Sequence, residues 1–373
     1  MGFHIVKRDN CPLWKKAVLY ISAVLIALII GAVILLTIGV NPIKYYTKMF
    51  TLGTLGNPIA YKTFMNYLDE FVPLALTAVA LSLAFKMRFW NIGGEGQFIM
   101  GAITAAFVAI KLGPVLPEFV TLILMCVAAM LVAGLYGLIA AVLKVKFGTN
   151  ETLMTLMLNY VALYLLFYIG ETKAPWNIFL QESSARSFFK DFAQFASFPE
   201  IGLGGNFKLN ICVILTLLVG VLIYVYMKRT KQGYEINVVG DSIGSARYAG
   251  MKVNKIILRT IFLSASLVGL GAAFKVGSVG TLSTSFTDDV GWTGIIVAWL
   301  AKLNTAAIFV VSALICVLQY GSTAAAATFS RVDSSFANML QGIILFLVLA
   351  ADFYTRFSVV FVKKNGKEEK NNG

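Results

Sequence analysis

The sequence has 373 residues, of which 58% are hydrophobic and only 13% are charged, and its mean hydropathy is +0.80. Soluble domains carry roughly 25% charged residues, so this composition excludes an ordinary soluble globular protein. Long uncharged runs recur along the chain, and a spanning helix needs about 20 largely apolar residues. Because backbone polar groups in hydrocarbon must be paired within the protein, we predict an all-α polytopic membrane protein with about ten transmembrane helices, some short or broken.

The predicted order begins with a basic N-terminal tail, residues 1–16, and ends with a second tail, residues 363–373. The transmembrane domain, 17–362, lies between them. Its predicted spans are 17–40, 71–85, 89–110, 119–143, 152–170, 209–227, 260–274, 290–301, 303–330 and 334–362. The longest external segment, 171–208, is long enough to pack as a lid or a docking surface.

The basic residues are distributed unevenly across this topology. The formal net charge is +13, and 21 of the 31 Lys and Arg residues fall on the side of the N-terminus. This is the positive-inside pattern, and it predicts that both termini are cytoplasmic. The basic composition therefore indicates membrane topology, and we expect no nucleic-acid partner.

A glycine-rich polar segment, Asn91 to Gln97, interrupts the apolar runs around it. Its three glycines allow a tight or broken backbone, and Asn91, Glu95 and Gln97 bring one carboxylate and two amides to it. Ionisable groups within a span are functional candidates because their burial is costly. Alternatively, Glu95 stabilises the positive N-terminal end of the helix that follows. Both roles stay open, and they are compatible.

A second polar segment opens the predicted span 152–170. Thr149 or Asn150 suits an N-cap, which places Glu151 in the first helical turn, where its charge favours the helix dipole. Thr152, Thr155 and Asn159 then share one face of this otherwise apolar helix, at spacings of three and four. Such a polar stripe faces either a neighbouring helix or a wet cavity.

The cytoplasmic segment 228–259 is the most basic internal part of the chain. Within it, Asp241 and Ser242 suit the start of a short helix that continues through Arg247 and ends at Gly250. A small polar helix between basic flanks is typical of a docking element, although composition alone also fits an ordinary cytoplasmic loop. Near the C-terminal end, the short span 290–301 follows a stretch rich in Gly, Ser and Thr. Such irregular backbone is tolerated at membrane depth only where it is buried or lines a cavity.

Several chemical signatures are absent from the sequence. There is no G-x-x-x-x-G-K-[ST] phosphate loop, so ATP binding of that type is excluded for this chain. The single histidine, His4, lies in the N-terminal tail. The residues show no metal-ligand spacing and no nucleophile elbow, and we expect neither a catalytic nor a metal site.

Taken together and in order, these segments resemble the permease subunits of bacterial ABC importers. The resemblance is to the nucleoside and simple-sugar branch of the branched-chain amino acid and ribose-type permease superfamily. It extends from about residue 65 to 350. The segments that carry it are 91–97, 148–151 with 157–160, 246–250 and 291–298.

The resemblance implies a transmembrane subunit that forms the translocation pathway for a nucleoside or a related simple sugar. Separate cytoplasmic ATPase subunits would bind ATP and Mg and supply the energy. A second permease subunit, expected to be non-identical, would complete the pathway. An extracytoplasmic lipoprotein or soluble binding protein would deliver the substrate. The expected location is the bacterial cell (inner) membrane, with multiple passes.

Two sets of residues follow as site candidates. The candidate pathway residues are Asn91, Glu95, Gln97, Asn150, Glu151, Thr155, Asn159, Tyr160 and Trp292. The candidate residues for coupling to the ATPase are Asp241, Ser242, Ala246, Arg247, Tyr248 and Gly250. Tyr160 and Trp292 are candidate stacking partners for a base, because every base has a π-face.

An alternative function is a proton-coupled secondary transporter that uses Glu95 or Glu151 as its proton site. An intramembrane enzyme is disfavoured because the sequence offers no catalytic constellation.

Overall fold

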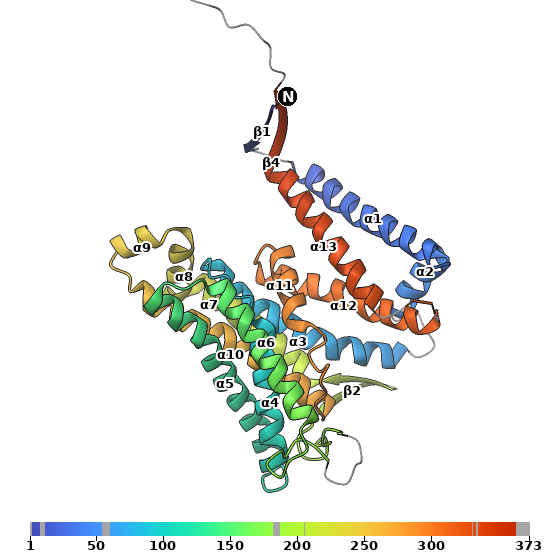
Figure 1. The fold of residues 1–373 in the computed structure, drawn as a ribbon, viewed down its shortest axis with the longest axis vertical. Coiled ribbons are helices and arrows are strands. Elements are labelled where there is room, and N and C mark those ends of the chain that lie inside the picture. Colours follow the sequence, from blue (N-terminus) through green and yellow to red (C-terminus); the bar gives the residue numbers. More distant parts are fainter. Residues whose placement is uncertain are drawn as a thin grey trace, which may run out of the picture. The chain divides into compact units, whose positions relative to one another are not determined.

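The computed structural model (Figure 1) describes residues 2–7, 12–53, 60–181, 187–204, 206–329, 331–332 and 335–362. The chain divides into a terminal unit, Met1–Gly53 with Gly321–Gly373, and a central unit, Thr54–Tyr320. In the described residues nine helices are long and apolar enough to cross a membrane, and a further apolar helix, α11 (Val290–Leu300), is shorter. The prediction of an all-α polytopic protein with about ten spans is confirmed.

The terminal unit brings the two ends of the chain together. It contains β1 (Gly2–Lys7), α1 (Leu13–Thr37), α2 (Pro42–Gly53), the last turns of α12 (Thr305–Thr328), α13 (Ser335–Arg356) and β4 (Phe357–Val362). β1 and β4 pair antiparallel, with Gly2 opposite Val362. The predicted span 334–362 is therefore too long at its C-terminal end. Phe357 to Val362 is rich in aromatic and β-branched residues, which favour a strand.

Two tyrosines hold α2 in the terminal unit. The buried Tyr45 hydroxyl lies 2.6 Å from Ser322 Oγ of α12. The Tyr46 hydroxyl donates to the backbone oxygen of Leu28 in α1 (2.7 Å). Buried polar groups are stable only when they are hydrogen-bonded, so these contacts allow two phenols to lie among apolar helices.

The central unit is a layered helical body (Figure 1). Its elements are α3 (Ala60–Lys86), α4 (Gly94–Leu112), α5 (Glu118–Phe147), α6 (Glu151–Glu171), β2 (Glu200–Gly204), β3 (Phe207–Asn210), α7 (Ile211–Arg229), α8 (Lys231–Asp241), α9 (Ile243–Tyr248), α10 (Val253–Val279), α11 and α12 as far as Tyr320. Helices α3, α4 and α10 form its inside, and the buried polar cluster described below lies between α4, α6 and α11.

Helix α3 is longer than the predicted span 71–85. It begins at Ala60 and includes Pro73 without ending there. The predicted span starts at residue 71 because the uncharged run begins after the acidic pair Asp69 and Glu70. A proline is tolerated inside a membrane helix because neighbouring groups satisfy the freed carbonyl.

The segment 171–208, predicted to be external, packs onto the end of α10 through its described residues. Phe198 contacts Phe274 edge-on, with ring centroids 5.5 Å apart. The Phe198 backbone N–H donates to Gly277 O (3.3 Å), and that of Phe192 donates to Gly280 O (2.9 Å). The hairpin of β2 and β3 closes the segment next to α7. The segment is thus a packed cover over α10, and a docking role for it stays a prediction.

Candidate functional site

The polar segment between α3 and α4 is non-helical and internally bonded. Residues 89–92 have no regular structure, and α4 begins at Gly94. The side chains of Asn91 and Gln97 pair with each other, with Gln97 Nε2 donating to Asn91 Oδ1 (3.1 Å) and Asn91 Nδ2 to Gln97 Oε1 (3.3 Å). Both residues are buried. Asn91 Oδ1 also accepts from Gly93 N (3.0 Å). These two candidates therefore stabilise the backbone of their own segment.

The polar stripe of α6 faces this segment. The Ile92 backbone N–H donates to Thr155 Oγ1 (3.2 Å). The amide of Asn159 bridges two backbone groups, accepting from Gly96 N (2.8 Å) and donating to Ile92 O (2.8 Å). Thr155 and Asn159 are both buried. Of the two interpretations of the stripe, the structure favours packing against a neighbouring element, because these side chains satisfy the backbone donors and acceptors that the broken helix exposes.

Glu95 lies in the first turn of α4, but its carboxylate reaches a different helix. Glu95 Oε2 accepts from the backbone N–H of Gly291 (2.8 Å), at the start of α11. The Thr287 side chain is a second hydrogen-bond partner, and Glu95 is only 6% exposed. The carboxylate therefore lies at the positive N-terminal ends of α4 and α11 together. Glu95 thus has the expected position at the N-terminal end of α4, and it also joins α4 to α11.

Gly291 is required for this junction. A Cβ atom at Gly291 would overlap the backbone nitrogen and Cα of Glu95. On the other side of α4, a Cβ at Gly96 would lie 3.0 Å from Asn159 Cα. Small residues allow helix backbones to approach closely in membranes, and here they bring α11 and α6 against the same turn of α4.

Asn150 and Glu151 lie at the edge of this arrangement and cap α6. The Asn150 side chain accepts from Thr152 N (3.0 Å), which confirms the predicted N-cap. Glu151 forms an ion pair with Lys144 in the last turn of α5. Asn150 is exposed and Glu151 is half-buried, so neither belongs to the buried cluster around Glu95.

The two candidate stacking residues lie in different surroundings. Trp292 follows Gly291 directly and is 36% exposed. Tyr160 is 49% exposed, on the outward face of α6 that also carries Met157, Tyr164 and Tyr168. The structure does not bring Tyr160 to the Glu95 junction, and its stacking role stays a prediction.

One buried cation was missed by the sequence reasoning. Lys275 in α10 is 7% exposed, and its Nζ lies 2.7 Å from Asp288 Oδ2 and 5.3 Å from the ring centroid of Phe286. Asp288 and Asp289 both have positive φ, and the side chain of Asp289, at the N-cap of α11, makes no capping bond. The available signal was the lone lysine within an apolar run, which calls for an anionic partner.

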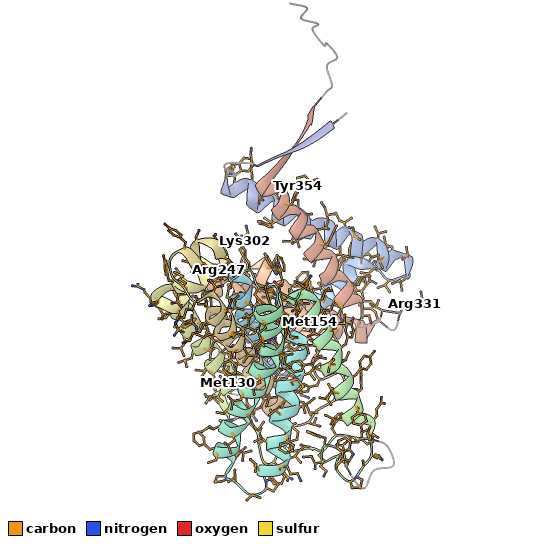
Figure 2. The ribbon with its side chains drawn as sticks, turned by 60° about the vertical axis from the view of Figure 1, so that its left-hand side comes forward. Met130, Met154, Arg247, Lys302, Arg331 and Tyr354 are labelled. Carbon is orange, nitrogen blue, oxygen red and sulfur yellow. The ribbon has the colours of Figure 1, made fainter. Side chains whose placement is uncertain are left out.

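An aromatic cluster at the C-terminal ends of α3 and α11 was also missed. The Trp90 and Trp299 rings are stacked, with centroids 5.2 Å apart, and Phe85 lies 5.5 Å from Trp299. Figure 2 shows Lys302, just after α11, at the same end of the central unit as Arg247 of α9. Aromatic spacing in sequence gave no hint of this cluster, because Trp299 is more than 200 residues away from Phe85 and Trp90.

The predicted docking helix is present as α9, in the segment predicted to be cytoplasmic. Helix α8 ends at Asp241, and Ser242 is the N-cap of α9, with its Oγ accepting from Ser245 N (3.2 Å). Gly250 has φ +75°, the left-handed conformation that suits the residue after a helix. The short helix and its two ends agree with the sequence-based expectation, with Ser242 as the capping residue.

This element is held firmly at its base and exposed at its tip. Ala246 is fully buried, and its carbonyl accepts from Met251 N (3.0 Å). A Cβ at Gly240 would overlap the carbonyl oxygen of Lys86, so α8 lies directly on the end of α3. In contrast, Tyr248 is 97% exposed and Arg247 is exposed as well. The geometry is that of a rigid projection from the helical body.

Comparisons with known proteins were made against this arrangement. Residues 63–349 match the model of the branched-chain amino acid transport system permease component family. The glucose ABC transporter permease protein of Haloferax volcanii is 29% identical over 94% of this chain and 92% of its own length. The guanosine ABC transporter permease protein of Bacillus subtilis is 28% identical over 92% and 96%, respectively. The nucleoside ABC transporter permease protein of Lactococcus lactis is 27% identical over 83% and 84%.

The matched region contains the whole polar junction and the docking helix, and it is most of the chain. With the membrane-crossing helices described above, these similarities identify a multi-pass protein of the cell membrane that is similar to ABC transporter permeases. The chain belongs to the branched-chain amino acid transport system permease component family.

Proposed function

We propose that this chain is the transmembrane subunit of an ATP-binding-cassette importer and forms the translocation pathway for a nucleoside or a related simple sugar. Separate cytoplasmic ATPase subunits bind ATP and Mg and drive the cycle. A second, non-identical permease subunit completes the pathway, and an extracytoplasmic lipoprotein or soluble binding protein delivers substrate. The chain itself is non-catalytic in this proposal.

The observation that carries the proposal is the projecting helix α9. An energy source in another subunit must act on this chain through a surface that is exposed and yet rigidly joined to the membrane helices. The exposed Arg247 and Tyr248, next to the fully buried Ala246, meet both requirements. Helix α8 precedes α9 and lies on the end of α3, so a force on α9 is transmitted through α8 to an inner helix. The absence of a phosphate loop from the sequence agrees with an external motor.

The Glu95 junction supports a pathway role for the central unit. Helix α11 has 11 residues, about 16 Å at 1.5 Å per residue, and is too short to cross a bilayer. Half-length helices whose N-termini meet inside the membrane are a recurring feature of transport sites. Glu95 holds the start of α11 in place, so a movement of α11 changes the lining of the pathway at Trp292.

The substrate class rests on the relatives. Two of the three compared above are named for a nucleoside or guanosine and one for glucose. A further relative, the fructose import permease protein of Bifidobacterium longum, is 27% identical over 58% of this chain. Their substrates share a polyhydroxylated sugar ring, which we propose as the recognised group. A base, when present, would stack on Trp292.

The decisive experiment separates ATP hydrolysis from uptake. In the reconstituted complex, Arg247→Ala with Gly250→Ala removes an exposed charge and strains a left-handed position. We expect the complex to assemble and hydrolyse ATP while uptake falls at least about tenfold, in line with a perturbed contact of about 1.4 kcal/mol.

A matched control uses Arg229→Ala with Gly39→Ala. This pair removes an exposed arginine outside α9 and strains a left-handed glycine of the terminal unit, Gly39 at φ +79°. Uptake should then stay close to wild type. Wild-type coupling in the Arg247 and Gly250 variant would refute the assignment of α9.

The proton-coupled alternative has less support from the geometry. Glu151 is paired with Lys144, and Glu95 is engaged by Gly291 N and Thr287. Both carboxylates therefore have structural partners that favour a fixed position. The alternative requires uptake by the single chain under a proton gradient without ATP.

A further inference from the structure

A basic hollow lies on the cytoplasmic side of the central unit, between α8 and the start of α10. It encloses about 420 Å³ and is lined on its charged sides by Lys231, Lys252, Lys255, Arg259 and Glu235. Four basic side chains thus face one acidic side chain. Arg259 Nη2 lies 3.0 Å from Glu235 Oε2, so the one acidic side chain is already paired. Among the ion pairs of the described residues, none involves the three lysines.

The local backbone increases the positive potential. Lys252 is the N-cap of α10 and makes no side-chain capping bond, and the first turn of α10 contains no acidic residue. The helix N-terminus, which itself favours an anion, is therefore surrounded by cations. The Arg259 guanidinium is held in place by Glu235 and by the side chain of Tyr226, so its charge stays at the wall of the hollow. Like charges gathered in one hollow are a costly arrangement unless an anion occupies it.

The two candidate spans that flank the hollow indicate that it lies near the lipid headgroups. Lys231 comes two residues after the candidate span Ile211–Arg229, and Lys252 immediately precedes the candidate span Val253–Val279. That second span is about 40 Å long at 1.5 Å per residue. The hydrocarbon core is about 30 Å thick, so about 10 Å of α10 extends beyond it. The basic residues Lys252, Lys255 and Arg259 favour this extension at the start of the helix. Tyr234, 62% exposed on the wall of the hollow, is a residue type enriched at this boundary.

We propose that this hollow binds the phosphate group of an anionic phospholipid from the cytoplasmic leaflet. Basic pockets between membrane helices on the cytoplasmic side are suited to such headgroups, which a zwitterionic lipid satisfies less well because it carries its own cation. Ala249 and Gly250, which follow the projecting helix α9, form part of the same wall. The lipid therefore contacts the base of the docking element from the membrane side, and its binding does not depend on the transported substrate.

Lipid retention by the purified full-length chain tests the proposal. Native mass spectrometry would compare phosphatidylglycerol with chain-matched phosphatidylcholine, for wild type and for Lys252→Gln with Lys255→Gln. We expect wild type to retain phosphatidylglycerol preferentially and the double variant to lose roughly tenfold or more in affinity for it. The matched control, Lys146→Gln with Lys228→Gln, removes two exposed lysines from the same face outside the hollow and should change affinity less than about threefold.

Several outcomes would overturn the proposal. These are equal retention of both lipids by wild type, or unchanged phosphatidylglycerol affinity in the double variant. Competition by millimolar inorganic phosphate without lipid selectivity would show a free-anion site instead. The same double variant would also be purified as part of the complex with its ATPase. Loss of the ATPase from that complex, with unchanged lipid retention, would assign the hollow to a protein partner. If the double variant fails to fold, as judged by its melting temperature in phosphatidylcholine, Lys231→Gln provides the same test with a single charge.

Discussion

Two sets of helices in the central unit meet the bilayer in different ways. The inner helices α3, α4 and α10 have 83%, 61% and 72% of their most apolar windows buried, whereas α5, α6 and α7 have 33% each. The mean hydropathy does not follow burial, since it is 1.3 for the inner helix α4 and 2.6 for the outer helix α5. Lipid is as apolar as leucine, so hydrophobicity alone does not draw a helix inward. Small and polar residues mark the inside of this protein.

Small residues let the backbones of the inner helices approach each other closely. A Cβ at Gly101 of α4 would lie 2.8 Å from Gly269 Cα of α10, and one at Gly269 would overlap the carbonyl oxygen of Ala129 in α5. The outer helices instead present large side chains outward, such as Leu131 and Tyr164, each more than half exposed. The comparison predicts that inner positions tolerate neither added volume nor lost hydrogen bonds, and that outer positions tolerate both.

The largest effect is expected for Gly291→Ala. The added methyl overlaps the Glu95 backbone at the junction of α11 and α4, and we expect a loss of about 3 kcal/mol, at the upper end of the usual range for overpacking. The melting temperature of the purified chain would measure it. Gly342→Ala is the control, because a Cβ there meets nothing within 4 Å. Equal melting temperatures for the two variants would contradict the close approach.

Asn159→Ala should follow, with a loss of about 2 kcal/mol. The change leaves Gly96 N and Ile92 O unsatisfied in a buried site. Thermal unfolding would be compared with Met157→Ala, on the exposed face of the same helix, which should lose less than about 1 kcal/mol. If Asn159 instead only lined a wet cavity, water would replace its bonds and the two variants would melt together.

Glu95→Gln is expected to cost about 1 kcal/mol, because an amide oxygen still accepts from Gly291 N while the charge that favours two helix N-termini is lost. Uptake by the ATP-driven complex should stay within about threefold of wild type. Glu95→Ala, which removes the acceptor, should lower both stability and uptake further. Abolished uptake in the Gln variant with unchanged stability would instead indicate a proton-binding role.

Tyr160→Leu should have the smallest effect on stability, within about 0.5 kcal/mol, because the residue lies on an outward face of α6. The informative measurement is uptake of a nucleoside against uptake of a simple sugar. Equal rates to wild type for both would remove Tyr160 from the pathway. A selective loss of nucleoside uptake would restore its stacking role.

Much of the fold was predictable because the bilayer restricts the choices. Apolar run length predicted the spans, and the N-cap at Asn150 and the short helix ending at Gly250 followed from local capping rules. Contacts between distant segments were not predictable. No single-sequence pattern joins Glu95 to Gly291 or Lys275 to Asp288. The first pairing depends on how α11 packs against α4, and the second on how the segment before α11 meets α10.

The polar stripe of α6 shows where the sequence evidence ended. Its spacing indicated a shared face but left open whether that face met protein or water, and the contacts of Asn159 with two backbone groups favour protein. Helix boundaries were least predictable where an apolar run continues past the end of the helix, as it does after α13. The strand Phe357–Val362 is apolar like the helix before it, so run length alone merged the two. Its aromatic and β-branched residues and its pairing with β1 distinguish them.

The central claim is that an external ATPase drives this permease. It is tested most directly by uptake of a radiolabelled nucleoside and a labelled simple sugar into liposomes that contain this chain with its ATPase and binding partners. We predict uptake that requires ATP on the side of α9 and that persists when the proton gradient is collapsed. Uptake by the single chain, driven by a proton gradient in the absence of ATP, would contradict the account.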